Sequence, residues 1–352
     1  MDFEKVRHQL EEALSNDPLN DDILCKLASA TIETRDFELG LDILRKAVEL
    51  KPNIQTLTNL GYFYLHEGEP TDDGWFQREG KAIQVLERAV GLNPLSHFTY
   101  SVLGEAYLKT DQNPAAQKTL TIAVEMVPTS ENLNNLGAAL YRLGKYSEAA
   151  ERFYQSHLLR SKDHYSFYPY LNHGFAQLKL GKSQEVNEIG SYLQENINLK
   201  SFDGVSSIDL MNLYYDNQDY HNCIKFFELT RGTFSVGTGE FGPYLFSLYQ
   251  LGQNAKAKEV YEQVLGKTLQ CIEDIGEDDE LDQENKDWQI KSFLQQIQGY
   301  KDIYLNVEKG IRPLSTFEPM VETQCYMFGC LRHGNPTYSE IIDGLAGQGD
   351  IL

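Results

Sequence analysis

The sequence has few of the features that mark a secreted, disulfide-bonded or membrane protein. Its five cysteines are odd in number and mostly far apart, so we expect reduced thiols and no disulfide framework. No uninterrupted apolar run approaches the roughly 18 residues needed to span a bilayer, which argues against membrane insertion. The N-terminal segment MDFEKVRHQLEEAL is charged throughout and lacks the apolar core of a signal peptide. We therefore expect a cytoplasmic protein.

Positive charge is also scarce. The chain has 31 Lys and Arg against 52 Asp and Glu, which gives a formal net charge of −21. Nucleic-acid binding needs clustered cations that replace phosphate counterions, and anionic membranes attract basic segments. We therefore expect neither nucleic acid nor a membrane surface as a partner, and this composition leaves protein or peptide ligands.

Small and apolar residues recur along the chain at matching spacings. The clearest unit begins near His97 and carries Gly104, Tyr107, Ala116, Leu120, Ala123 and Pro128. The next unit carries Leu136, Gly137, Ala149 and Phe153. Two earlier units carry Ala28, Gly40, Leu44, Ala47 and Pro52, and Leu60, Gly61, Ala82, Leu86, Ala89 and Pro94. Small residues allow two helices to approach closely, apolar residues three or four apart form one buried stripe, and proline ends a helix.

This pattern resembles the tetratricopeptide repeat, whose period is about 34 residues. The resemblance implies an all-α, right-handed superhelical solenoid of tandem helix pairs, in which the first helix of each pair lines a concave groove. We expect an N-terminal half-repeat helix over residues 1–20 and about seven repeats over residues 21–268. An insertion at residues 69–80 interrupts the array, and Trp75 within it could anchor a partner or fold back onto the helices. A smaller irregularity falls at residues 161–167.

The last quarter of the sequence departs from the repeat. Residues 269–310 are expected to form an acidic loop followed by an amphipathic helix that caps the array, because exposed solenoid ends need covering. Residues 311–352 form a tail of irregular composition with no expected role.

Asparagine recurs at one position of the expected groove. The residues that stand two places before each Gly or Ala slot are Lys26, Asn59, Val102, Asn135 and Asn172. An Asn amide has both donors and an acceptor, so it can pair with a peptide backbone. Three Asn on one face could therefore hold an extended segment without reading its sequence. Asn is common at this slot in the family, so it does not identify a ligand.

A second set of residues supplies charge and aromatic area. His66, Lys109, Arg142 and Lys179 occupy equivalent positions and form either a basic ladder for an acidic peptide or pairs with nearby carboxylates. Tyr side chains can add apolar area and a hydroxyl at a peptide interface. The partner-binding candidates are Asn59, Tyr62, His66, Lys109, Asn135, Tyr141, Arg142, Asn172 and Lys179.

Three soft ligands lie close together in the tail. Cys325, Cys330 and His333 form a C-x4-C-x2-H arrangement, which could bind zinc although a fourth ligand is not evident. The same residues could form a nucleophilic Cys with a His base, or belong to a packed apolar segment with Tyr326 and Phe328 facing the array. We expect no cofactor and keep the three residues as metal candidates.

Three classes of function remain open. The first is a scaffold or adaptor that binds a peptide or partner protein in the concave groove. The second is a peptide-responsive bacterial regulator that acts through a protein partner. The third is an enzyme or metal protein with its chemistry in the tail. The sequence has no phosphate loop, nucleophile elbow or Gly-rich nucleotide turn, so we expect a scaffold and not an enzyme.

Overall fold

The computed structural model describes residues 1–71, 74–160, 167–197, 205–230, 237–315 and 317–348. The side chains of Trp75, Thr230 and residues 346–348 lie outside this description, as does most of the irregular segment at 161–167. The two interpretations of Trp75 therefore stay open. The chain divides into two compact units: unit 1 combines Met1–Arg160 with Met320–Leu352, and unit 2 is Ser161–Pro319.

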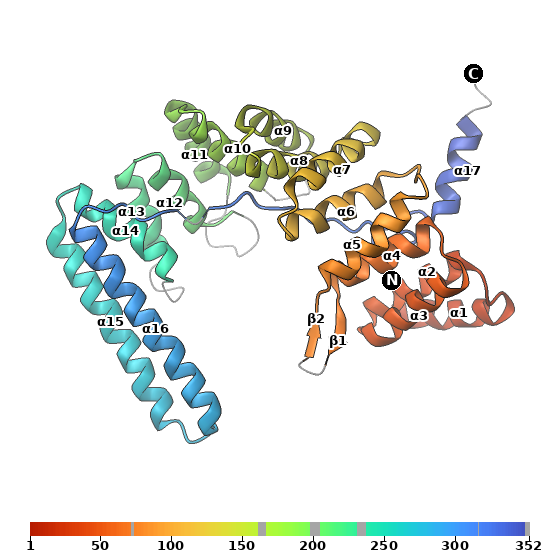
Figure 1. Ribbon diagram of the computed structural model, residues 1–352, viewed down its shortest axis with the longest axis horizontal. Coiled ribbons are helices and arrows are strands. Elements are labelled where there is room, and N and C mark those ends of the chain that lie inside the picture. The colour runs from red at the N-terminus through yellow and green to blue at the C-terminus, as the bar shows by residue number, and fades with distance from the viewer. Residues whose placement is uncertain (72–73, 161–166, 198–204, 231–236, 316, 349–352) are drawn as a thin grey trace. The chain divides into compact units, whose positions relative to one another are not determined.

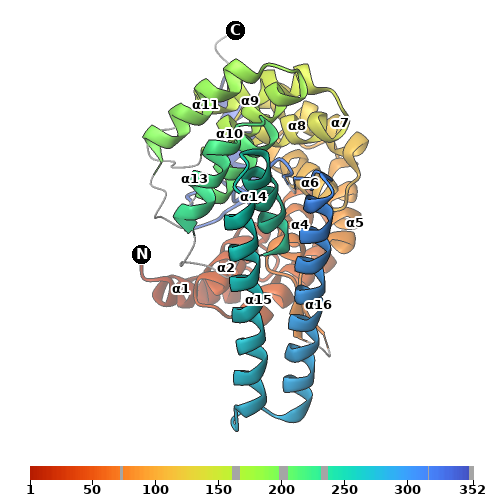
Figure 2. The same ribbon diagram turned by 90° about the vertical axis from the view of Figure 1, so that its left-hand side faces the viewer.

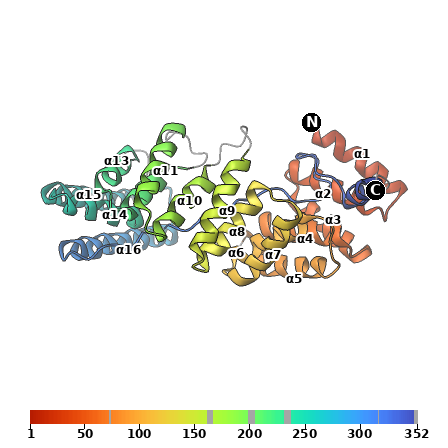
Figure 3. The same ribbon diagram turned by 90° about the horizontal axis from the view of Figure 1, so that it is seen from above.

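Unit 1 is a series of packed helix pairs (Figure 1). Its helices are α1 (Phe3–Asn16), α2 (Asp21–Glu33), α3 (Phe37–Leu50), α4 (Ile54–His66), α5 (Glu79–Val90), α6 (His97–Lys109), α7 (Asn113–Met126), α8 (Ser130–Arg142) and α9 (Tyr146–Leu159), with α17 (Tyr338–Gln348) near the C-terminus. The first helix of each pair packs on the second, and α2, α4, α6 and α8 also contact one another in sequence. Figure 3 shows the pairs α4–α5, α6–α7 and α8–α9 following one another.

Unit 2 continues the alternation of paired helices. Its helices are α10 (Tyr168–Lys179), α11 (Ser183–Asn196), α12 (Ser207–Asp216), α13 (Tyr220–Thr230), α14 (Thr238–Gln250), α15 (Asn254–Glu277) and α16 (Gln283–Glu308). The pairs are α10 with α11, α12 with α13 and α14 with α15, each in contact. Both units thus have the architecture of an α-solenoid of tandem helix pairs.

The glycines of the repeat do what the sequence pattern predicts. A Cβ atom on Gly61 would lie 2.5 Å from the Leu86 side chain of α5, and one on Gly137 would lie 2.7 Å from the Phe153 ring of α9. Both distances are shorter than any van der Waals contact, so glycine lets the second helix of a pair lie directly against the first. Leu86 and Phe153 are fully buried as a result.

The insertion at 69–80 contains a short pair of β-strands within the all-α array. Strands β1 (Glu69–Thr71) and β2 (Gly74–Phe76) pair in antiparallel register and form a short hairpin before α5. The buried Glu69 carboxylate accepts hydrogen bonds from Arg45 and Arg78 at 2.7 and 3.0 Å, and it also pairs with Lys81. Burial alone would raise the pKa of Glu69, but these cations hold it below its usual value. The hairpin is therefore fastened to α3 and α5 by charge.

The acidic loop is shorter than the sequence indicated. α15 continues to Glu277, and only residues 278–282 join it to α16 (Figure 2). The Asp282 side chain caps the first turn of α16. The second half of α16 packs on the last pair: the Tyr300 ring lies 5.1 Å from Phe241 of α14. The predicted capping helix is present, but it is one arm of a long helical hairpin whose far end carries the carboxylates.

The C-terminal segment between α16 and α17 is extended and has little regular structure. In Figure 1 it is the dark blue trace that follows α16 and leads to α17. Among the described residues, no helix combines the length and apolar character needed to cross a bilayer.

Candidate functional site: the face formed by the first helices

The first helices of unit 1 hold the chain's own C-terminal segment. We call the surface formed by α2, α4, α6 and α8 the first-helix face, and residues 320–331 the docked tail. Hydrogen bonds join the docked tail to Asn135 and Asn134 of α8, Glu105 of α6, Asn59 of α4 and Ser29 of α2. The docked tail therefore runs past the four helices in the reverse of their chain order.

Two asparagines make the same paired contact with the tail backbone. Asn59 donates from Nδ2 to the Phe328 carbonyl oxygen at 2.8 Å, and its Oδ1 accepts the Phe328 N–H at 2.7 Å. Asn135 donates to the Glu322 carbonyl oxygen and accepts the Glu322 N–H, both at 2.8 Å. Both amides are buried, at 0% and 3% exposure. Each side chain thus satisfies both backbone polar groups of one tail residue, whatever that residue's side chain is.

The spacing of these contacts matches an extended chain. Glu322 and Phe328 are six residues apart, and six extended residues span about 20 Å. Asn135 and Asn59 stand on α8 and α4, two first helices apart, and helices that pack side by side lie about 8–10 Å from one another. The spacing between neighbouring first helices therefore matches the length of about three extended tail residues.

Aromatic packing completes the hold on the docked tail. The Phe328 ring is fully buried and stacks on Phe98 of α6 with centroids 5.1 Å apart. Tyr326 lies against Phe98 and meets the His97 ring edge-on at 5.5 Å. Burial lowers the pKa of His97 to about 4, so this ring is neutral where it touches the tail. Asn132 donates to His97 Nδ1 at 3.2 Å, which fits a neutral ring with Nδ1 as the acceptor.

Three residues of the predicted basic ladder pair with groups of the array itself. Buried Glu105 faces Lys109 and His66, each at 3.5 Å, and also accepts a 2.8 Å hydrogen bond from Thr323 of the docked tail. Arg142 donates to the Leu108 carbonyl oxygen at 2.7 Å and lies 3.4 Å from Asp111. Of the two interpretations, pairing with nearby acceptors describes these residues.

The other candidates fall in different surroundings. Tyr62 is buried, and its ring lies tilted against the His66 ring with centroids 4.3 Å apart. Tyr141 is partly exposed and its ring contacts Tyr146 of α9. Asn172 is buried on α10 and Lys179 is exposed at the end of that helix, so both belong to unit 2. The first-helix face of unit 1 therefore brings together Asn59, Tyr62, His66, Lys109 and Asn135.

Unit 2 holds the preceding part of the C-terminal segment by side chains. Tyr215 of α12 donates to the Pro313 carbonyl oxygen at 2.7 Å, and the Arg312 guanidinium lies 4.6 Å from the Tyr215 ring centroid. Arg312 also donates to the Tyr215 carbonyl oxygen and lies 3.5 Å from Asp216. Phe317 stacks on Phe175 of α10.

The Cys and His residues of the tail lie together on unit 1. The ligand atoms of Cys325, Cys330 and His333 are all within 4.8 Å of one another, and Cys330 Sγ is 3.3 Å from His333 Nδ1. The neighbouring Cys325 thiol and the contacts of His333 lower the pKa of Cys330, against the effect of burial. The interaction between the two thiols raises the pKa of Cys325 in turn.

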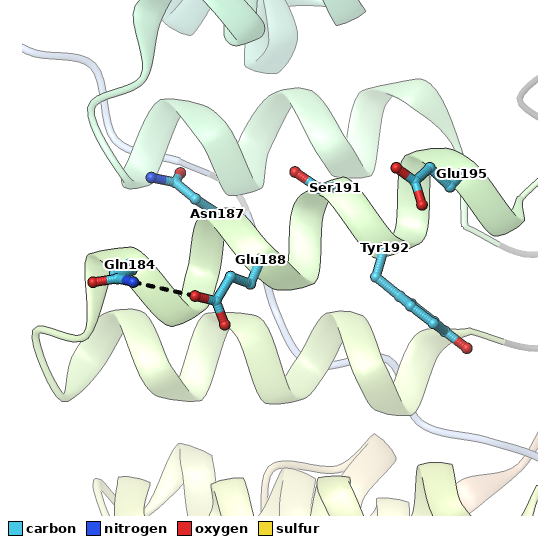
Figure 4. Close-up of a pocket in the computed structure, with 6 residues that line it drawn as sticks. All are labelled: Gln184, Asn187, Glu188, Ser191, Tyr192 and Glu195. Carbon is cyan, nitrogen blue, oxygen red and sulfur yellow. Dashed lines mark hydrogen bonds between the residues drawn. The ribbon is translucent and has the colours of Figure 1, made fainter.

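A depression on unit 2 lies away from these contacts. It is lined by Gln184, Asn187, Glu188, Ser191, Tyr192 and Glu195, as Figure 4 shows. All six belong to the exposed side of one helix, α11, and Gln184 donates to Glu188 within it. The exposed surface of a single helix, with no second element lining it, does not form a binding site.

Several residues that hold the tail were missed by the sequence analysis. Ser29 accepts the Leu331 N–H at 3.1 Å, Gln55 accepts the Tyr338 N–H, and Asn134 donates to the Met320 carbonyl oxygen at 2.8 Å. Gln55 and Asn134 stand on the same helices as Asn59 and Asn135, and Ser29 stands on α2, which carries no predicted asparagine. The repeat pattern singled out the residue two places before each small Gly or Ala and a second set of basic positions. It did not single out Ser29, Gln55 or Asn134.

Comparison with known proteins identifies the repeat in part of the chain. Residues 102–165 match the family model described as tetratricopeptide repeat. No curated protein matches the sequence. Among solved structures, the chain is similar to YrrB, described as a TPR protein with an unusual peptide-binding site, at 17% identity over 53% of this chain and 91% of that one, with a TM-score of 0.44.

Two other solved structures resemble larger parts of the chain. A tetratricopeptide repeat protein from Parabacteroides merdae ATCC 43184 is 15% identical over 65% of this chain and 86% of that chain, with a TM-score of 0.45. Yeast Tom70 is 14% identical over 89% of this chain and 62% of that chain, with a TM-score of 0.43. The chain therefore contains tetratricopeptide repeat sequence at 102–165, within an α-solenoid of tandem helix pairs.

Proposed function

We propose that the protein is an interaction scaffold that binds an extended segment of a partner polypeptide on the first-helix face of unit 1, in place of the docked tail. The observation that supports this most is the paired contact of Asn59 and Asn135 with the backbone of Phe328 and Glu322. This contact needs only an extended backbone, so a segment from another chain can form it equally well.

The partner segment would be selected by shape and apolar side chains. The Phe98 ring and its neighbours accept large aromatic groups at the positions now filled by Tyr326 and Phe328. Lys109 and His66 already face Glu105. An acidic ligand is therefore not required, and an extended segment with two aromatic residues in a short stretch fits the face best.

The docked tail makes this binding a competition. A segment attached to the same chain has an effective concentration that reaches the millimolar range, so a free ligand must bind more tightly or be abundant to replace it. Displacement leaves the tail, with α17, available outside the face. The peptide-responsive regulator is the second proposal, because exchange of tail for ligand gives two states that a protein partner could distinguish.

Affinity capture with three baits tests the proposal. The wild type is compared with Asn59→Ala/Asn135→Ala, which weakens the face, and with Tyr326→Ala/Phe328→Ala, which weakens the tail and leaves the face intact. We expect partner recovery to rise in the tail variant and to fall in the face variant, because the tail competes and the asparagines bind. Asn196→Ala on α11 is the matched control, since this Asn is exposed and bonds only within its helix.

The outcomes separate the alternatives. Equal recovery by all baits, at matched folding measured by circular dichroism, would mean that partners use another surface and would contradict the proposal. Loss of a partner from the tail variant alone would assign recognition to the tail itself.

A further inference from the structure

The tail residues Cys325, Cys330 and His333 form a cluster of soft ligands that the scaffold function does not use. Their Sγ and ring nitrogen atoms lie within 4.8 Å of one another, and Cys330 Sγ is 3.3 Å from His333 Nδ1. Cys330 is buried, Cys325 partly buried, and His333 exposed. The cluster is thus enclosed on the sulfur side and open to solvent on the imidazole side.

The loop that carries the cluster is fixed by its own hydrogen bonds. The Asn335 side chain donates to the carbonyl oxygens of Cys325 and Met327 at 2.8 and 3.0 Å, and the Asn335 N–H donates to the Cys330 carbonyl oxygen at 3.0 Å. Gly329, at φ +71°, allows a left-handed turn between the two cysteines, which other residues rarely adopt. The three ligands therefore meet because the loop is folded.

Polar groups around the sulfurs are those of a metal site's surroundings. Asn335 Nδ2 lies 3.8 Å from Cys325 Sγ as a donor. The Tyr62 and Ser29 side chains act to lower the pKa of Cys325 and Cys330, respectively. Donors to coordinating sulfurs orient the ligands and stabilise the negative charge that remains on metal-bound thiolates. Tyr62 and Ser29 come from α4 and α2, so the array contributes to this shell.

We propose that Cys325, Cys330 and His333 bind one Zn²⁺ ion, with water as the fourth ligand. Zn–S and Zn–N bonds of about 2.3 and 2.0 Å in a tetrahedral site place ligand atoms about 3.5–3.8 Å apart. The Cys330 Sγ–His333 Nδ1 distance is 3.3 Å, and no two ligand atoms of the cluster are more than 4.8 Å apart, so the range for a zinc site lies between these values. Thiolate and imidazole ligands select zinc over magnesium or calcium.

Binding follows a balanced exchange of zinc for protons. Both thiols lose a proton to solvent as the two Zn–S bonds form, and the neutral imidazole donates its Nδ1 lone pair. Among the described residues, no further Cys, His, Asp or Glu joins the three. The fourth position therefore stays with solvent, next to the exposed imidazole.

Zinc would secure the part of the tail that the face holds most firmly. Phe328, which pairs with Asn59, lies between the two cysteine ligands in the sequence. A ligand that binds the folded loop and not the free one stabilises the folded loop by mass action. Zinc binding and tail docking are therefore linked, so zinc would weaken the binding of a competing partner, while the zinc content of the isolated chain does not depend on any partner.

Metal analysis of the full chain tests the site. The reduced protein is loaded with one equivalent of zinc chloride, desalted and measured by plasma mass spectrometry. We expect about one zinc per chain, with a loss to under about a tenth of that in Cys325→Ser and in Cys330→Ser. Cys271→Ser is the matched control, since this cysteine is exposed on α15 of unit 2, and it should retain full zinc.

A second readout keeps the test valid if the serine variants fold poorly. Cobalt added to the wild type should give the visible bands of a tetrahedral site and a thiolate charge-transfer band, both removed by competing zinc. Wild type without zinc or cobalt binding would overturn the proposal, as would equal zinc in Cys325→Ser. A freshly purified chain lighter by two hydrogens, with Cys325 and Cys330 joined in a disulfide, would overturn it too.

Discussion

Unit 1 and unit 2 hold successive parts of one C-terminal segment by different kinds of contact. In unit 1 the main hydrogen bonds run from Asn59 and Asn135 to the tail backbone, and they are indifferent to the tail's side chains. In unit 2 the contacts depend on side chains, with Arg312 over Tyr215 and Phe317 on Phe175. The two units therefore differ in their hydrogen bonds, while both add aromatic packing, of Phe328 on Phe98 in unit 1 and of Phe317 on Phe175 in unit 2.

The difference indicates which unit is suited to exchange its occupant. The paired backbone hydrogen bonds of unit 1 can form with another extended chain, whereas the contacts of Arg312 and Phe317 need a sequence that supplies these side chains. Under the proposed function, unit 1 therefore exchanges its occupant and unit 2 anchors the segment. Four substitutions or changes of condition would sharpen or break this division.

The largest effect is expected for Phe328→Ala. The ring is fully buried against Phe98 and Tyr338, so its loss should destabilise tail docking by about 3–5 kcal/mol. Phe317→Ala in unit 2 removes a half-buried ring and should cost less, about 1–2 kcal/mol. Hydrogen–deuterium exchange of each segment measures both, and the reverse order of effects would break the comparison.

Asn135→Ala should have the next largest effect. It leaves the Glu322 N–H and carbonyl group without their partners, which costs about 1–3 kcal/mol of docking free energy. Denaturant unfolding and exchange rates of the docked tail measure this loss. Changing the Glu322 side chain to Gln keeps both backbone hydrogen bonds to Asn135, so docking should change less than in Asn135→Ala. A larger effect of Glu322→Gln than of Asn135→Ala would show a side-chain grip in unit 1.

Acidification should loosen unit 1. The folded pKa of His97, about 4, lies below the unfolded value of about 6.5, so the unfolded state binds more protons between these pH values. Stability is complete above the unfolded pKa and falls as the pH drops toward 4, by roughly 1–2 kcal/mol between pH 7 and 5. His97→Gln should remove this part of the pH dependence of unfolding; an unchanged profile would contradict the assignment.

The smallest effect is expected for Arg312→Gln in unit 2. A partly exposed cation over an aromatic ring, with an ion pair to Asp216, contributes about 1 kcal/mol. Exchange in residues 311–315 should increase several-fold without a change in residues 320–331. Leu314→Ala is the control, because this side chain is 88% exposed and its removal should change nothing measurable.

Much of the helical array could be predicted from the sequence, because each repeat signals itself locally. The close approach at Gly61 and Gly137 follows from small residues opposite large ones. The short hairpin at 69–76 could not be predicted, since it depends on Glu69 reaching Arg45 and Lys81 from other elements. The carboxylate-rich end of α15 looked like a loop because charge density alone does not reveal that α16 packs along it.

The sequence indicated which side chains of the candidate site can bind a backbone, but not that the docked tail lies there. The amides of Asn59 and Asn135 were identified as able to hold a backbone, and they hold one. That this backbone is the chain's own tail depends on two long-range contacts. Asn135 and Glu322 are separated by 187 positions, and Asn59 and Phe328 by 269, so no local pattern encodes them. Binding of a partner on the same face stays a prediction.

Hydrogen–deuterium exchange of the docked tail tests the central claim most directly. We predict that the segment containing Glu322 and Phe328 is protected in the wild type relative to the segment around Leu314. In Asn59→Ala/Asn135→Ala that protection should fall by roughly tenfold or more, because two paired backbone contacts are lost. Equal exchange of the two segments in the wild type, or unchanged protection in the variant, would contradict the account.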